Sequence, residues 1–304
     1  MKTTKNKEHL ADLALLSVAI IWGVTFLMVQ EATRETPVFA FLFWRFFLST
    51  LFFGVILLVL KKKIHFPSLK YGAVLGILFC LAYLFQTFGL VHTLSSVVGF
   101  ITGLSVILVP FLAWILLGHH QSIFGLLGAL LSAVGLWLIS TGGGSFGLGL
   151  GEFLTLVCAT LFALHIVYTG LFSHSRDVNT LVLTQFATAS LICLLLSLLF
   201  DSYTIPPKLS PTLLVALGIT SVFATVFAFF VQTYAQQFTT PAKTAIIFTA
   251  EPVSAGVFGY FYGGEPLGVT QILGGGLIVG AILIVELGAL WIASRRLGED
   301  HASI

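Results

Sequence analysis

Apolar residues along this chain gather into ten runs of about 20, each separated by a short stretch that carries polar residues, glycine or proline. A helix that spans the hydrocarbon core of a bilayer needs about 20 mostly apolar residues, so each run predicts one transmembrane helix. The sequence therefore predicts an all-α integral membrane protein with ten transmembrane helices. The expected spans are Leu10–Gln30, Pro37–Leu60, Tyr71–Val91, Ser95–Leu117, Ser122–Ser140, Gly151–Phe172, Val178–Phe200, Pro211–Ala235, Ala242–Tyr262 and Leu267–Trp291.

The chain also resembles two copies of one five-helix unit. The segment ending in Pro110 and the segment ending in Pro252 align with their prolines 142 positions apart. Because five is odd, the second unit must enter the membrane from the opposite side, which is the inverted-repeat pattern of secondary transporters. We place the first unit at residues 1–141, a glycine-rich linker at 142–150 and the second unit at 151–304.

Composition and charge support this interpretation and set the orientation. Hydrophobic residues make up 58% of the chain and charged residues only 9%, against about 25% charged in a soluble domain. Eleven Lys and Arg residues fall on the side of the N-terminus, ten outside the expected helices and Lys243 at the start of the span Ala242–Tyr262, and only Arg34 and Lys208 fall on the other side. By the positive-inside rule, both termini are expected in the cytoplasm, in a multi-pass protein of the cell (inner) membrane. The net charge of +2 gives no reason to expect a nucleic-acid partner.

Pairs of glycines spaced four apart predict close contacts between helices, because small residues let backbones approach in lipid. The pairs are Gly72/Gly76, Gly99/Gly103 and Gly276/Gly280.

Three ionisable residues lie deep inside expected helices, where each charge costs about 2.5–3.5 kcal/mol on insertion scales. Arg45 is either a clamp for a substrate carboxylate or phosphate or a structural partner of a helix end or an acid. Glu251, directly before Pro252, either binds a cationic group or carries a proton, or else is a paired structural acid. His165 is either a titrating substrate ligand or a hydrogen-bonded packing residue.

Polar and aromatic side chains at similar depth extend this list. Gln185 occupies the repeat position equivalent to Arg45, so both are expected to face the interior. Gln86 and Gln232 begin the related strings Gln-Thr-Phe-Gly and Gln-Thr-Tyr-Ala, and glutamines at this depth hydrogen-bond either to another helix or to a ligand. Trp22 and Tyr168 are candidates for cavity walls, with packing and interface anchoring as the alternatives.

Motifs typical of soluble enzymes and of nucleotide-driven pumps do not indicate a different function for this chain. Residues 143–147 match G-x-S-x-G, but a nucleophile elbow needs a strand-to-helix turn, and here the string lies in a glycine-rich loop. The sequence contains neither an H-E-x-x-H string nor a phosphate-binding G-x-x-x-x-G-K-[ST] string. We therefore expect no cofactor and no metal, and an ion gradient or substrate exchange as the energy source.

Both halves resemble the EamA domain of the drug/metabolite transporter superfamily. In the first half the resemblance rests on Trp22-Gly-Val-Thr25-Phe, Arg45 and Val-Pro110. In the second it rests on Gln232-Thr-Tyr-Ala-Gln, Thr-Pro-Ala-Lys243, Glu251-Pro252, Gly264-Glu-Pro-Leu and Gly274-Gly-Gly, so that it covers nearly all of residues 10–290. It implies two inverted five-helix EamA-type repeats, a central cavity and transport of small metabolites such as amino acids, often outward.

The sequence thus predicts a secondary-active transporter that exports a small metabolite by alternating access between its two repeats, and no enzymatic activity. A membrane-embedded enzyme acting on lipids is the alternative, and a structural or channel-like protein is a third. The partners expected are the substrate and the lipid bilayer, and a monomer and a homodimer both stay open. The residues expected to bind substrate are Trp22, Thr25, Arg45, Gln86, His165, Tyr168, Gln185, Gln232 and Glu251.

Overall fold

The computed structural model is a bundle of helices, and it describes residues 2–93, 95–118, 122–141, 149–263 and 268–302. No strand occurs within those ranges, which confirms the all-α prediction. The first half contains α1 (Lys2–Glu35), α2 (Val38–Val59), α3 (Leu69–His92), α4 (Ser95–Gly103), α5 (Ser105–Leu117) and α6 (Ile123–Thr141). The second contains α7 (Leu150–Ser173), α8 (Val178–Phe200), α9 (Pro211–Ser221), α10 (Ala228–Ala235), α11 (Pro241–Phe248), α12 (Ala250–Gly263) and α13 (Val269–Ala302).

Seven helical stretches in the described part of the chain are long and apolar enough to cross a membrane. They cover α1, α2, α3, the α4–α5 pair, α7, α8 and the run from α9 to α10. Two shorter apolar stretches, Ile123–Leu138 and Ile272–Val285, lie in α6 and α13. The protein is therefore a multi-pass membrane protein, while the count of ten crossings stays a prediction.

Two of the expected helices are broken, which the sequence did not predict. The run expected at Ser95–Leu117 divides at Leu104 into α4 and α5, and the run expected at Ala242–Tyr262 divides at Thr249 into α11 and α12. At the second break, the Thr249 N–H bonds the Ile246 carbonyl three residues back, at 3.1 Å, which tightens the end of α11. Pro252 follows in the first turn of α12, where its missing N–H costs no helical hydrogen bond.

A third irregularity lies between α9 and α10. Residues Val222–Phe227 form a π-helical segment, η2, within the stretch expected as one regular helix. The wider turn of a π-helix shifts the hydrogen-bonding pattern of the backbone, and such segments are frequent at functional sites.

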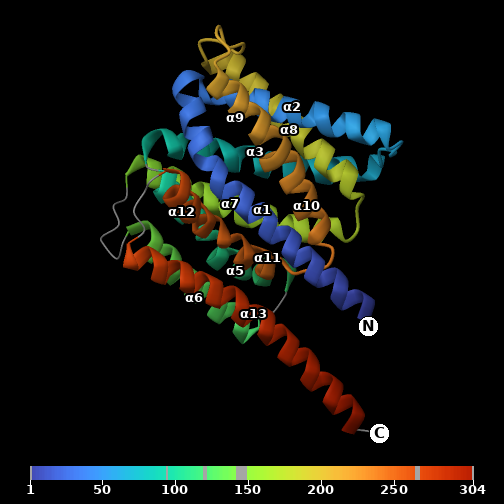
Figure 1. Cartoon of the computed structure of the whole chain (residues 1–304). Coiled ribbons are helices and arrows are strands. Elements are labelled where there is room, and N and C mark those ends of the chain that lie inside the picture. The colour runs from blue at the N-terminus through green and yellow to red at the C-terminus, as the bar shows by residue number, and fades with distance from the viewer. Residues whose placement is uncertain (1, 94, 119–121, 142–148, 264–267, 303–304) are drawn as a thin grey trace.

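Helices of the two halves interlock, as Figure 1 shows. In the interior, α3 packs against α7 and α8, and α2 packs against α8. On one side of them α1 runs along α9, α10, α11 and α12, and on another side α6 and α13 lie along each other (Figure 1). Contacts between α1 and α11, and between α3 and α7, therefore join the first half to the second.

Close approach of α3 to α8 depends on glycine. A Cβ added at Gly76 would lie 2.7 Å from the Thr188 Cβ and 2.8 Å from the Gln185 carbonyl oxygen. Gly72 faces Thr184 at 2.7 Å in the same way, so the expected contact is confirmed for this pair. The expectation is wrong for Gly276 and Gly280, because no described atom would lie within 4 Å of a Cβ at either position.

Candidate functional site

A cavity with an empty volume of about 720 Å³, counting the space at its mouth, lies between the two halves. Helices α1, α2 and α3 of the first half and α7, α10, α11 and α12 of the second contribute to its wall, as do residues on either side of the break between α4 and α5. Six of the nine residues predicted to bind substrate line it. They are Trp22, Thr25, Arg45, Gln86, Gln232 and Glu251.

Arg45 is held at the cavity wall by neutral groups. Its Nε donates to the Thr225 hydroxyl at 2.9 Å, and its Nη2 donates to the Tyr83 hydroxyl at 3.2 Å and to the Ala224 carbonyl at 3.5 Å. The guanidinium also lies over the Tyr83 ring, 4.4 Å from its centroid. Arg45 is only 2% exposed, and none of the ion pairs among the described residues includes it. A buried cation without an acidic partner is costly, so the site favours an anionic group beside it.

The π-helical segment supplies two of the Arg45 acceptors. Thr225 and Ala224 both lie in η2, and the Ala224 carbonyl also accepts from the Trp22 Nε1 at 2.9 Å. Residues of the second half therefore orient Arg45 and Trp22 of the first half.

Glu251 is the acidic residue of the cavity wall. It lies in the first turn of α12, directly after the break at Thr249. The prediction placed it about nine residues into a continuous helix, and the break corrects this. Among the described residues its carboxylate has no hydrogen-bond partner, while its backbone carbonyl accepts from the Ser254 hydroxyl at 2.9 Å. The N-terminal end of a helix favours a negative charge, which suits an acid at this position. The carboxylate is thus available to a cationic group in the cavity.

Amide and hydroxyl groups add polar contacts around the cavity. The Gln86 Nε2 donates to the Thr102 hydroxyl at 3.4 Å, at the end of α4. The Gln232 Nε2 donates to the Gln236 Oε1 at 3.3 Å, and the Thr25 hydroxyl donates to the Trp22 carbonyl at 3.0 Å. These bonds leave the Oε1 of Gln86 and that of Gln232 without a donor among the described residues.

Three predicted residues lie outside the cavity wall. The His165 Nε2 and the Gln185 Oε1 are 3.1 Å apart, and both side chains are fully buried. The His165 ring packs near Phe79 and Phe229, with centroids 6.1 Å and 5.6 Å away. Tyr168 contacts Phe172, at 5.6 Å between centroids. The structure therefore joins His165 and Gln185 in an interior polar pair and does not bring these three residues to the cavity.

Aromatic side chains form much of the remaining wall, and most were not among the predicted site residues. Phe26, Tyr83, Phe162 and Phe248 line the cavity beside Trp22, whose ring is 4.9 Å from that of Phe248. Helical periodicity would have found some of them, because residues spaced by three, four and seven share one face. Phe26 and Val29 follow Trp22 and Thr25 in this spacing, and Tyr83 precedes Gln86 by three.

These observations define a class of protein: a helical, multi-pass membrane protein with a central cavity enclosed by two interlocking halves. Comparison with known proteins identifies its family. Residues 9–141 and 149–287 each match the EamA-like transporter family, and the chain belongs to that family. The two matches confirm the resemblance and the presence of two EamA repeats.

Two relatives support this assignment, and one solved structure has a similar fold. An uncharacterised transporter of Archaeoglobus fulgidus is 34% identical over 285 residues, which cover 92% of this chain and 87% of the relative. A second uncharacterised transporter of that organism is 36% identical over 69 residues, covering 23% of this chain and 25% of its own length. A crystal structure with 17% sequence identity and a TM-score of 0.78, covering 91% of this chain and 98% of that chain, has the same fold.

Family membership makes the chain a membrane transporter of the drug/metabolite transporter superfamily. It points away from an enzyme and does not favour the alternative of a lipid-modifying activity.

Proposed function

We propose that this protein is a secondary-active exporter of a small zwitterionic metabolite, an amino acid or a related compound. Its two halves alternate the access of the central cavity between the two sides of the membrane. In this proposal ten segments cross the bilayer as two inverted five-helix units, with α4–α5 and α11–α12 each forming one crossing, and both termini lie in the cytoplasm.

The observation that carries the proposal is that Arg45 and Glu251 both line one cavity. Arg45 lacks an acidic partner among the described residues, and the Glu251 carboxylate lacks a hydrogen-bond donor there. A zwitterion supplies both missing groups, a carboxylate for the guanidinium and an ammonium for the carboxylate. Aromatic rings beside them, such as those of Trp22 and Phe162, accommodate the apolar part of such a molecule.

Irregular backbone at the same place supports transport rather than a static pore. Breaks in transporter helices expose helix ends and carbonyl groups to a substrate near the midplane. Here the α11–α12 break places Glu251 and Thr249 at the cavity, and the α4–α5 break places Gly103 and Ser105 there.

A ligand screen followed by an exchange assay tests the proposal. Thermal unfolding of the purified protein is measured with amino acids, nucleosides and carboxylates. A ligand at 100 times its Kd stabilises the folded state by about 2.7 kcal/mol. We expect zwitterions to raise the melting temperature, and the same compounds to exchange across proteoliposome membranes.

The outcome of the exchange assay decides between the possibilities. If neutral nucleosides stabilise and exchange while zwitterions do neither, the proposed substrate class is wrong. If no compound exchanges, the proposed transport activity is wrong for these classes of metabolite.

A further inference from the structure

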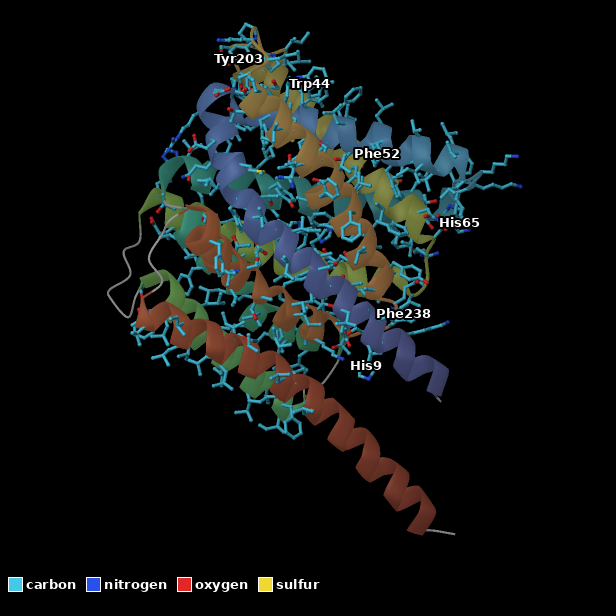
Figure 2. All side chains as sticks on the ribbon, in the orientation of Figure 1. His9, Trp44, Phe52, His65, Tyr203 and Phe238 are labelled. Atoms are coloured by element: carbon cyan, nitrogen blue, oxygen red, sulfur yellow. The ribbon has the colours of Figure 1, made fainter. Side chains whose placement is uncertain are left out.

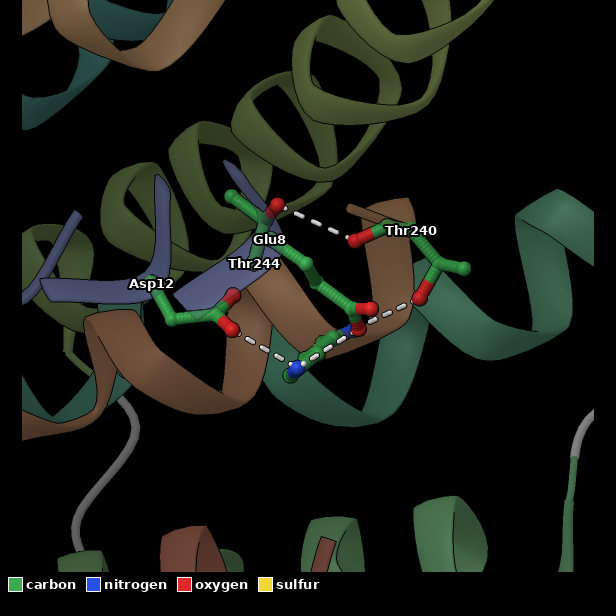
Figure 3. A network of polar contacts seen from close by, with 5 residues as sticks. Glu8, Asp12, Thr240 and Thr244 are labelled. Atoms are coloured by element: carbon green, nitrogen blue, oxygen red, sulfur yellow. Dashed lines mark hydrogen bonds and ion pairs between the residues drawn. The ribbon is translucent and has the colours of Figure 1, made fainter. Parts of the chain in front are cut away.

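A charged cluster joins α1 to α11 away from the cavity, and Figure 3 shows it from close by. The Lys243 Nζ lies 2.8 Å from the Asp12 Oδ2 and 3.0 Å from the Glu8 Oε1. The side chains of Lys243 and Asp12 are only 8% and 9% exposed, whereas Glu8 is 41% exposed. The cluster therefore begins at the edge of the protein and continues into its interior.

Lys243 occupies a position that helix energetics alone would disfavour. It lies in the first turn of α11, whose cap is Thr240: the Thr240 hydroxyl accepts from the Lys243 N–H at 3.2 Å. The Thr244 hydroxyl donates to the Thr240 carbonyl at 3.0 Å, which further fixes this turn (Figure 3). A cation at a helix N-terminus opposes the helix dipole, and burying it adds a desolvation cost. Neither cost suits a residue whose role is only to stabilise the fold.

The cluster and the cavity lie on the same two helices, at different heights. On α1, the residues Trp22, Thr25, Phe26 and Val29 line the cavity, whereas Asp12 precedes Trp22 by ten residues. Ten residues correspond to about 15 Å along a helix. On α11, Ala245 and Phe248 line the cavity, and Lys243 precedes both. The cluster thus lies between the cavity and the end of the bundle that carries the N-terminus.

Figure 2 shows which residues lie at the two ends of α1. His9 and Phe238 lie toward the N-terminal end of α1, and Tyr203 and Trp44 lie at the far end (Figure 2). At that far end the Tyr203 hydroxyl donates to the Glu35 carbonyl at 3.0 Å, which attaches the end of α1. The ion pairs of Lys243 therefore join α1 to α11 near the N-terminal end of α1.

We infer that Lys243 is a positioning residue for transport, whose ion pairs with Asp12 and Glu8 hold α1 against α11 and close the cavity on the N-terminal side. Their separation opens that side. The inference rests on the proposed function, because it assigns these residues to one of the two states that alternating access requires.

An ionic contact suits a closure that must open. Separating an apolar contact would expose apolar surface to water, whereas separated ions recover their hydration. The attraction in the pair and the desolvation cost of forming it oppose each other, so the closed and open states differ little in free energy.

Access to a cysteine in the cavity wall tests the inference without any substrate. Cys80, Cys158 and Cys193 are first replaced by alanine, and Ala245→Cys then places one thiol on α11. A membrane-impermeant maleimide is added on the side of the N-terminus. We expect Lys243→Gln to raise the labelling rate at least tenfold, because α1 and α11 then separate more often.

Matched variants separate the ion pairs from other effects. Lys243→Arg keeps a cation in the cluster and should label like the parent. The exchange of charges in Asp12→Lys with Lys243→Asp should restore slow labelling. Lys62→Gln removes an exposed lysine that has no ion pair among the described residues, and should leave the rate unchanged.

Two results would overturn the inference. One is parental labelling in both folded Lys243→Gln and folded Asp12→Asn. The other is loss of folded protein in both variants, since the cluster would then be a structural contact. If these variants label at the parental rate and also exchange metabolite at the parental rate, only the role inferred for Lys243 is refuted. Faster labelling in a protein that exchanges no metabolite refutes only the proposed transport.

Discussion

Replacing Arg45 by glutamine is the most direct test of the candidate site. Arg45 uses Nε and Nη2 for the bonds to Thr225, Tyr83 and Ala224, so Nη1 is the nitrogen left for a ligand. A hydrogen bond to a charged group contributes about 1.5–3 kcal/mol. Losing one such bond weakens affinity by roughly 10- to 150-fold, since about 1.4 kcal/mol corresponds to tenfold. We therefore expect Arg45→Gln to lose most of its transport of an anionic or zwitterionic substrate at concentrations near the KM of the parent.

A lysine at this position should restore transport only in part. The ammonium keeps the charge and has three donors, but it lacks the planar fork, so it does not reproduce the spacing of the bonds to Thr225, to Tyr83 and to the ligand. We expect Arg45→Lys to have an affinity between those of Arg45→Gln and the parent. Affinity is read from ligand-dependent melting temperatures, and transport from exchange in proteoliposomes.

Arg34→Gln is the matched control for both variants. Arg34 is 67% exposed and pairs with Glu31 at 2.8 Å on the surface of α1. Such surface pairs contribute about 0–1 kcal/mol, so this variant should fold and transport like the parent. Two results contradict the reasoning. One is that Arg45→Gln binds the substrate with parental affinity. The other is that Arg45→Gln and Arg45→Lys both insert into the membrane but cannot be purified as folded protein. The second would make Arg45 a structural residue.

Three further predictions follow from the fold and the site. Gly76→Ala should lower the stability of the purified protein by about 1–3 kcal/mol through overpacking against α8. Gly218→Ala should not lower it, because no described atom lies within 4 Å of a Cβ at that position. Equal melting temperatures of the two variants would contradict the packing of α3 on α8. Glu251→Gln should remove the pH dependence of uptake while substrate exchange stays measurable, and a parental pH profile would exclude Glu251 from coupling. A tag after Ile304 should resist an external protease in intact cells, and its cleavage would refute the ten-helix count or the orientation.

Hydrophobic runs were enough to predict the helices, but not where the helices break. Polar residues do lie beside both breaks, Thr102 and Ser105 around Leu104 and Thr249 at the second, but single hydroxyl residues are common in transmembrane helices and do not mark a break. Pro252 indicates only that a backbone carbonyl about one turn earlier is freed. The break depends on the tertiary contacts that satisfy the freed backbone groups, and these contacts are not local in sequence.

The burial of Arg45 and Gln185 could be predicted from the sequence, but the direction in which each side chain points could not. Arg45 and Gln185 were both expected in the interior, and they are 2% and 0% exposed. Yet Arg45 lines the cavity, while Gln185 pairs with His165 away from it. The partner of Arg45 on η2, Thr225, is 180 positions away, a separation that carries no sequence signal.

The charged cluster was missed for a related reason. Lys243, at the start of the expected span Ala242–Tyr262, was counted among the basic residues on the side of the N-terminus, but its side chain is only 8% exposed within α11. Its acidic partners are more than 230 positions earlier in the chain. Only the packing of α1 along α11 brings these residues together.

Different residues at equivalent positions make the site asymmetric, although the two halves are similar. The position equivalent to Glu251 in the first half is Val109, which lies inside α5, whereas Glu251 lies in the first turn of α12. The position equivalent to Arg45 is Gln185, which is neutral and bonded to His165. The cation therefore comes from the first half and the acid from the second. When the halves move relative to each other, the distance between these two charges changes, so a ligand that bridges them favours one arrangement of the halves. That coupling of ligand to conformation is what an alternating-access transporter requires.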